Sequence, residues 1–140
     1  MSFKEDLRIG EAIERVWLDK LLVTFKDAYA TFGNDSRFDI YVPEIDTSIE
    51  VKYDPKSLDT GNIVIEYYHN KPSGMLTTEA DYWLFVTPKE EIWISRKNMF
   101  RCVLVEGLQP TMIHGPEDRH PKAVFLVPVK TLRLYAQSLS

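Results

Sequence analysis

The sequence predicts a single α/β domain. The chain has 140 residues, which is enough for one substantial core but not for two domains. Apolar residues recur at helical spacing in one long segment near the N-terminus, and short alternating or continuous apolar segments follow it. A helix, several strands, a second helix and further strands in this order are typical of an α/β fold. No repeat, low-complexity segment or internal linker divides the chain.

The composition narrows the class of protein. A hydrophobic fraction of 44% is that of a globular protein rather than a disordered one. No apolar run reaches the roughly 18 residues of a membrane span, and the N-terminus lacks an apolar signal segment, so we expect no membrane association. Cys102 is the single cysteine, which excludes an internal disulfide and favours a cytoplasmic location. Because no motif frames it, we expect a buried structural thiol rather than a nucleophile.

The net charge of −4 counts mildly against DNA binding, because nucleic-acid-binding domains are usually basic. The objection weakens if acids hold metal, since the chain without Glu14, Asp39, Glu50 and Glu66 would be neutral. A neutral remainder permits local basic patches but does not require them.

The first element is a predicted helix over residues 5–24. No proline interrupts it, and its apolar stripe is made of Ile9, Ile13, Val16, Trp17 and Leu21. Glu14 lies beside this stripe, at the edge of the buried face, where it either reaches solvent or belongs to a site. Gly10 lies one turn earlier and costs about 1 kcal/mol relative to alanine. A close approach of another segment at this face is one reason for a glycine there.

Two strands come next, at residues 27–32 and 38–42, with a loop at 33–36 between them. The second strand carries one acid, Asp39. Residues 44–47 form a turn, and the strand at 49–53 runs back. Antiparallel neighbours joined by such a turn bring Asp39 close to Glu50.

The strand at 49–53 alternates strictly and organises the rest of the chain. Ile49, Val51 and Tyr53 face a core, whereas Glu50 and Lys52 share the opposite face. Charged groups on a strand built for burial are costly unless they have partners. A divalent cation on Glu50 and an anionic substrate on Lys52 would be such partners, and a simple salt bridge between the two residues is the alternative.

Asp39, a ten-residue gap and Glu50-x-Lys52 resemble the PD-(D/E)XK nuclease superfamily, the restriction-endonuclease-like fold. Phe38 stands where the family has proline. Gly10-x-x-x-Glu14-Arg15 is similar to the first-helix pattern of Holliday-junction-resolvase-like members. The resemblance implies a mixed central sheet flanked by helices, with the site at one edge.

The same resemblance implies the site residues and their chemistry. Asp39, Glu50, the backbone carbonyl of Val51 and Glu14 would hold Mg²⁺ or Mn²⁺, the ions that hard oxygen ligands select. Lys52 would orient the attacking water or stabilise the phosphate. No covalent protein nucleophile is needed.

Glu66 stands alone in a further strand, at 62–68. If this strand neighbours the strand of Glu50, Glu66 is a further metal ligand; otherwise it points outward. The segment at 73–80 then resembles the Ser-Gly and acid-containing helix of phage-encoded members. Ser73 or Thr77 would cap that short helix and expose N–H groups suited to a phosphate.

The remaining elements follow from local pattern. A polar connector at 54–61 precedes the strand of Glu66. A continuous apolar run at 82–86 predicts a central buried strand, and 91–95 predicts another. A helix begins at Arg96, residues 106–122 form a loop or lid with His114 and His120 on the surface, and a strand at 123–129 precedes an amphipathic helix at 130–139.

The candidate contacts to DNA are phosphate-binding residue types on loops and helix starts: Lys56, Lys71, Ser73, Arg96, Lys97, Arg101, Arg119 and Lys122. Such residues position a backbone without reading bases, and no sizeable insertion supplies major-groove contacts. We therefore expect a structure-selective endonuclease acting on branched DNA such as a four-way junction. The alternatives are an inactive nucleic-acid-binding domain of the same fold, a restriction-type enzyme or an exonuclease.

We also expect a homodimer, because pairing gives a small nuclease a larger footprint and a second site, and two-fold dimers are the commonest oligomers. The apolar segments 123–129 and 130–139 would contribute to its interface.

Overall fold

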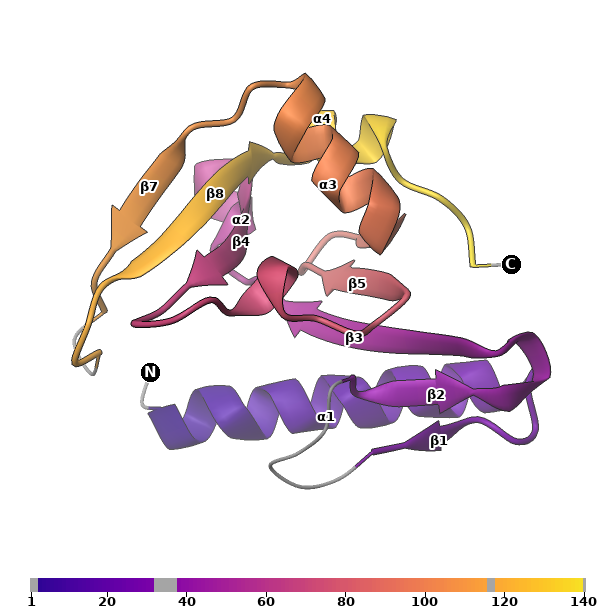
Figure 1. Cartoon of the computed structure of the whole chain (residues 1–140). Helices are drawn as coiled ribbons and strands as arrows, with labels where there is room; N and C mark the ends of the chain where they lie inside the picture. The colour runs from indigo at the N-terminus through magenta and orange to yellow at the C-terminus, as the bar shows by residue number, and fades with distance from the viewer. Residues whose placement is uncertain (1–2, 32–37, 116–117, 140) are drawn as a thin grey trace.

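Two sheets organise the fold (Figure 1). The computed structural model describes residues 3–31, 38–115 and 118–139. The helices are α1 (Phe3–Leu22), α2 (Ser57–Thr60), α3 (Arg96–Val105) and α4 (Val129–Leu134), with 3-10 turns η1 (Pro43–Ile45) and η2 (Gly74–Leu76). The strands are β1 (Tyr29–Ala30), β2 (Ile40–Val42), β3 (Thr47–Tyr53), β4 (Asn62–Tyr68), β5 (Tyr82–Val86), β6 (Glu91–Ser95), β7 (Pro110–Ile113) and β8 (Lys122–Pro128).

Sheet A is mixed, as expected, and has the strand order β1-β2-β3-β5-β6. β2 and β3 are antiparallel, β3 and β5 are parallel, and β6 returns antiparallel to β5. β3 and β5 therefore lie in the middle of the sheet, which confirms the central place predicted for 82–86. Sheet B has the order β4-β8-β7 and is antiparallel throughout.

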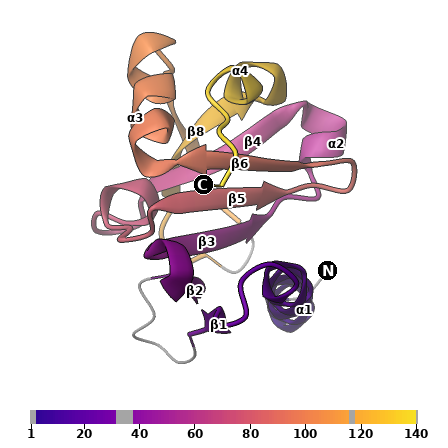
Figure 2. The same ribbon diagram turned by 90° about the vertical axis from the view of Figure 1, so that its right-hand side faces the viewer.

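The two faces of sheet A build two cores, because alternate residues of a strand point to opposite faces. Leu84 packs with Ile49, Val51 and Leu21 of α1, and these apolar side chains form the first core. Trp83 and Phe85 point the other way and pack with residues of sheet B, α3 and α4. In both Figure 1 and Figure 2, α1 lies at the bottom of the molecule while α3 and α4 lie at the top.

Helix α1 forms where its apolar stripe predicted it. Ile13 and Trp17 pack on the first core, and the ring of Trp17 meets Trp93 edge-on at 5.8 Å. One assignment was wrong, since Val16 is 49% exposed. Residues three and four apart share a helix face, and Val16 lies one position before Trp17, which carries the contact.

Cys102 is fully buried in the second core, as expected for a structural thiol. Burial, followed by the nearby Glu106 carboxylate, raises the pKa of its thiol to about 11. At this pKa the thiolate, which is the reactive form, is scarce near neutral pH.

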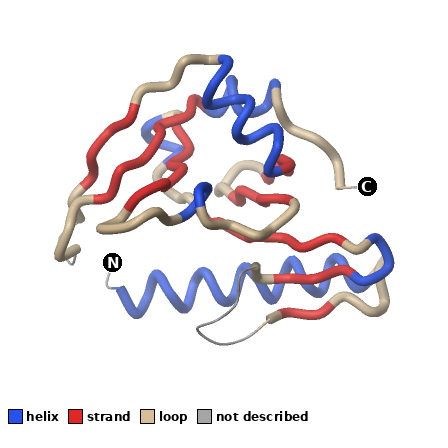
Figure 3. Tube along the Cα trace, in the orientation of Figure 1, coloured by secondary structure: helices blue, strands red, loops and turns tan. Residues whose placement is uncertain are grey.

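Several local assignments differ from the structure, and Figure 3 shows where helical turns stand among the strands. The connector at 54–61 contains α2, and the loop at 106–122 contains β7. The helix predicted for 73–80 shrinks to the three residues of η2, and the terminal helix ends at Leu134. The loop predicted at 33–36 lies outside the described residues.

The strand at 123–129 was predicted to contribute to a dimer interface. In the structure β8 is the middle strand of sheet B, with Ala123, Val124 and Val127 buried. These three side chains are used within the chain and are not available to an interface, whereas Phe125 and Leu126 are partly exposed. In the part of the chain that the structure describes, no helix is long and apolar enough to cross a membrane.

Candidate active site

Strand β3 places Glu50 and Lys52 on one face and the core residues on the other, as the alternation predicted. Ile49 is fully buried and Val51 is 7% exposed, within the core under α1. The Lys52 Nζ lies 3.8 Å from the Glu50 Oε2 and 5.3 Å from the centre of the Trp83 ring. The Glu50 side chain is 20% exposed and that of Lys52 48%, so only the lysine reaches well into solvent.

Asp39 lies beside Glu50, which confirms the proximity predicted from the turn. Its backbone N–H donates to the Ile49 carbonyl at 2.9 Å, and one of its carboxylate oxygens accepts from the Val51 N–H at 2.7 Å. This second bond is possible because β2 begins at Ile40, opposite Ile49, while β3 continues to Tyr53. The N–H and C=O of one strand residue point to the same neighbour, so the Val51 carbonyl faces this edge as well.

Glu14 completes a group of three acids. It comes from α1, and its carboxyl group shares a hydrogen bond with that of Asp39. The Glu50 carboxyl also shares a hydrogen bond with Asp39. We call Glu14, Asp39 and Glu50 the acid cluster. Of the two alternatives for Glu14, the structure therefore shows the one in which it joins the other acids.

The acid cluster is electrostatically crowded. Burial raises the pKa of Glu50 to about 8, and the charges of Asp39 and Glu14 add to this, while Lys52 opposes it. Burial also raises the pKa of Glu14 to about 7, with further contributions from Asp39 and Glu11. Lys52 thus does not neutralise its neighbour. Burial and the approach of like charges both favour the neutral form of a carboxyl group.

The donor chemistry of the cluster fits a divalent cation. Carboxylate and carbonyl oxygens are the ligands that Mg²⁺ and Mn²⁺ prefer, and a cation would replace the shared protons. Asp39, Glu50, Glu14 and the Val51 carbonyl come together at one edge of sheet A, as predicted. Among the described residues, no group of three or more histidine, cysteine, aspartate or glutamate side chains is arranged so that it could hold a metal ion.

A cleft of about 590 Å³ adjoins the acid cluster. Its lining includes Gly10 of α1, Glu66 and Lys122 of sheet B, and Trp83 of β5. Lys52 belongs to the lining, whereas the three acids do not. Lys52 therefore connects the cluster to the cleft.

The expected reason for Gly10 was wrong. Among the described residues, a Cβ atom built at this position would meet no atom within 4 Å outside its own helix, so none of these residues approaches it closely. Because Gly10 lines the cleft, its missing side chain adds open space there instead.

Glu66 faces the cleft, but not as a neighbour of Glu50. Its strand, β4, pairs with β8 in sheet B and not with β3, so the premise for a further metal ligand was wrong. One Glu66 oxygen accepts from the Ser73 hydroxyl at 2.7 Å, and the other lies 3.8 Å from the Lys122 Nζ. Both oxygens thus have partners of their own.

Ser73 does not cap a helix, contrary to expectation. Its hydroxyl donates to Glu66, no side-chain cap is made at η2, and η2 is too short to offer a phosphate site. Thr77 ends η2 rather than starting it.

Sequence reasoning missed two residues that shape the cleft. Gly74 has φ +51, and a Cβ atom there would lie 2.1 Å from the Glu66 carbonyl oxygen, so only glycine fits. The Asp54 carboxylate accepts from the Ser57 and Val64 N–H groups, at 3.2 and 3.1 Å, and so ties the end of β3 to β4. The Ser-Gly pair after a strand was the available signal for the glycine, whereas nothing local marks Asp54.

The predicted DNA contacts separate into two groups. Lys56 and Lys122 line the cleft. Lys71 and Arg119 are exposed on neighbouring turns, which the ring of His69 joins through the His120 carbonyl at 3.1 Å.

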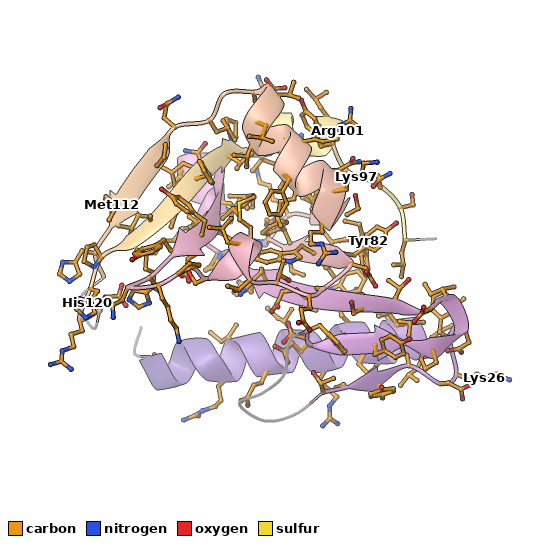
Figure 4. The ribbon with its side chains drawn as sticks, viewed as in Figure 1. Lys26, Tyr82, Lys97, Arg101, Met112 and His120 are labelled. Atoms are coloured by element: carbon orange, nitrogen blue, oxygen red, sulfur yellow. The ribbon has the colours of Figure 1, made fainter. Side chains whose placement is uncertain are left out.

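The second group lies on α3, away from the cleft. Figure 4 shows Lys97 and Arg101 on this helix, at the opposite end of the molecule from His120. Arg96 begins the same helix and donates to the Thr78 carbonyl. One surface therefore does not hold all the candidate cations.

Comparisons with protein-family models, with curated proteins and with solved structures gave no match.

Proposed function

We propose that this protein is a metal-dependent deoxyribonuclease that hydrolyses phosphodiester bonds, with a restriction-endonuclease-like arrangement of its site. The observation that carries the proposal is the meeting of Glu14, Asp39 and Glu50 beside Lys52. These residues come from α1, the start of β2 and β3, and they lie at the side of a cleft. Crowded acids with raised pKa values next to a cleft are typical of functional sites.

Asp39, Glu50, Glu14 and the Val51 carbonyl are the groups that would hold Mg²⁺ or Mn²⁺. When bound, such a cation supplies positive charge against the charge that develops on the phosphoryl group and lowers the pKa of the attacking water. The Val51 N–H fixes one oxygen of Asp39 at 2.7 Å, so this carboxylate is oriented before any ligand arrives. Orientation of this kind lowers the reorganisation needed during reaction.

Lys52 is the residue that meets the substrate. Its ammonium group is half exposed, lines the cleft and lies 3.8 Å from the nearer oxygen of Glu50. This distance is longer than an ordinary hydrogen bond, so the ammonium protons remain available to a phosphate oxygen. Lys52 would therefore hold the phosphate at the point where the cleft meets the acid cluster.

A large separation between Asp39 and Glu50 would have favoured the alternative in which Glu50 and Lys52 form only a salt bridge. Their carboxyl groups instead share a hydrogen bond, and Lys52 does not keep the pKa of Glu50 low. An inactive nucleic-acid-binding domain would have no use for a cation at these acids. Isothermal titration with Mg²⁺ and Mn²⁺ tests this. The proposed nuclease should bind the cation and lose this binding in Glu50→Gln, whereas an inactive domain should show no such binding in either protein.

For the substrate we propose branched DNA in preference to linear duplex. The cations near the cleft, Lys52, Lys56 and Lys122, are of the type that contacts phosphates rather than base edges. The test is cleavage of a four-way junction, a flap, a single strand and a duplex of the same sequence, with Mg²⁺ or Mn²⁺. Equal cleavage of junction and duplex, or fragments from one recognition sequence, would reject this preference.

The same assay in EDTA tests the metal requirement. We expect no cleavage without a divalent cation and full recovery after Mg²⁺ or Mn²⁺ is added in excess. Full activity in EDTA would contradict the proposed function itself.

We further propose a homodimer, with an interface at α3 and α4 rather than at β8. Leu104, Val105 and Leu134 are 76%, 68% and 78% exposed, and they are the apolar side chains these helices leave to solvent. Light scattering at micromolar concentration should give twice the 16.3 kDa mass of the chain. A species of 16.3 kDa would contradict the dimer.

A further inference from the structure

The size of the cleft restricts what can enter it. Its volume of about 590 Å³ lies in the range of roughly 300–1,000 Å³ that is usual for small-molecule sites. The major groove of B-DNA alone is about 12 Å wide, so a whole duplex is wider still and cannot lie inside a cleft of this volume. Residues of α1 and residues of sheet B both line it. Nucleic acid inside the cleft is therefore a single strand.

Three lysine side chains in the lining of the cleft can bind the phosphates of a single strand. Lys52 and Lys56 come from the end of β3 and the turn after it, and Lys122 comes from β8 of sheet B. Two acids also line the cleft, but the structure uses both internally. Asp54 accepts from two backbone N–H groups, and Glu66 is held by Ser73 and Lys122.

Lys122 is positioned from two sides. Its Nζ lies 3.8 Å from Glu66 and 3.9 Å from Asp118, and its side chain is 35% exposed. Ser73 fixes Glu66, and Gly74 packs directly against the Glu66 backbone. The ion-pair distances exceed those of ordinary hydrogen bonds, so the ammonium protons can still bind a phosphate oxygen.

We propose that the cleft binds one unpaired DNA strand, with Lys52 at the scissile phosphate and Lys122 at a second phosphate of the same strand. The inference rests on the proposed function, because it takes the reacting phosphate to lie beside the acid cluster. It sharpens the substrate class: among branched substrates, those with an unpaired strand bind best, and fully paired arms bind weakly.

Fluorescence anisotropy with end-labelled oligonucleotides of one sequence tests this binding. Single strand, flap, four-way junction and blunt duplex are titrated in Ca²⁺, an oxygen-preferring cation, and gels confirm that each stays intact. We expect the single strand and the flap to bind at least about tenfold more tightly than the duplex, with the junction between them. Equal affinity for single strand and duplex would overturn the inference.

Lys122→Gln provides the residue-level test. Loss of a hydrogen bond to a charged group should weaken single-strand binding by about tenfold. Loss of one phosphate contact on a single strand should lower the slope of log affinity against log salt by about 0.7. Lys122→Arg should retain most of the affinity. Lys26→Gln makes the same charge change at an exposed residue that does not line the cleft and that Figure 4 places at the opposite side of the molecule from His120, so it should leave both readouts unchanged.

The outcomes separate this inference from the proposed function. A protein that prefers single strands through Lys122 but cleaves nothing in Mg²⁺ or Mn²⁺ rejects the nuclease and keeps the strand-binding cleft. If the protein cleaves duplex and single strand equally, and Lys122→Gln binds single strand as tightly as Lys26→Gln does, the cleft proposal is rejected and the nuclease proposal stands. Thermal unfolding of each variant identifies any that fails to fold. If Lys122→Gln does not fold, the affinity of Lys122→Arg for single strand and for duplex decides between the outcomes.

Discussion

Glu50 and Glu66 look alike in the sequence but differ in their surroundings. Each is a single acid in an otherwise apolar strand. Glu50 shares a hydrogen bond with another acid, Asp39, and burial raises its pKa to about 8. Glu66 is bonded to the Ser73 hydroxyl and lies 3.8 Å from Lys122. The partners of an acid, rather than its place in a strand, separate a candidate metal ligand from a structural group.

The difference has a thermodynamic consequence. Glu66 is stabilised by groups that belong to the fold, so its removal costs stability. Burial and the neighbouring acids disfavour the charged form of Glu50, so its removal should not cost stability. Buried groups kept in an unfavourable arrangement are common at functional sites, where the strain belongs to the mechanism.

The largest expected effect is that of Glu50→Gln on cleavage. The change removes one candidate metal ligand. Mutation of a residue that only hydrogen-bonds to a metal ligand typically lowers activity by about 10–100-fold, so we expect loss of a ligand itself to lower activity by at least about a hundredfold. Stability at pH 8 should not fall, because the crowding with Asp39 and Glu14 is relieved. Single-turnover cleavage and urea unfolding measure the two quantities. Retention of more than a tenth of the activity would place the metal elsewhere.

The two glycines that line the cleft give the next contrast. In Gly74→Ala the new Cβ would lie 2.1 Å from the Glu66 carbonyl oxygen at φ +51, so we expect a loss of about 2–4 kcal/mol in the free energy of unfolding. Gly10→Ala meets open space within a helix and should be neutral or stabilising by up to about 1 kcal/mol. Urea denaturation measures the free energy of unfolding of both variants. Equal effects would contradict the close contact between Gly74 and the Glu66 backbone.

The pH dependence of stability follows from the acid cluster. Because the pKa values of Glu14 and Glu50 are raised to about 7 and 8 from 4.5, the folded state holds more protons than the unfolded state in between. Without metal, the free energy of unfolding should therefore fall as pH rises from about 4.5 to 8. Excess Mg²⁺ should flatten this decline, and the double variant Glu14→Gln/Glu50→Gln should lack it. A metal-free protein that gains stability over this range would disprove the crowding.

The smallest expected effect is that of Glu66→Gln. It removes a half-exposed ion pair with Lys122 and weakens the bond from Ser73, so about 1 kcal/mol of stability should be lost. Cleavage should fall by less than about tenfold, because Glu66 positions Lys122 and does not join the acid cluster. A loss of cleavage activity as large as that of Glu50→Gln would indicate that Glu66 is a metal ligand after all.

The sequence by itself determined the parts that depend on local pattern. The strict alternation of 49–53 fixed which side chains face the core, and the short turn at 44–47 brought Asp39 to Glu50. The helical stripe placed Glu14 at the edge of a buried face. These features follow from the periods of strands and helices and from the limited reach of a tight turn.

Only the tertiary structure decided which strands pair. The alternation of β4 is the same whether it joins β3 or β8, and long-range backbone hydrogen bonds and burial placed it in a separate sheet. That choice placed Glu66 in a different sheet from Glu50 and gave it Ser73 and Lys122 as partners. It also set Gly74 against the Glu66 backbone, where a Cβ atom would lie 2.1 Å from the carbonyl oxygen. Pairing between distant segments depends on the surface that each strand buries. That surface is made by residues far apart in the chain, so the local pattern of one strand does not reveal its partner.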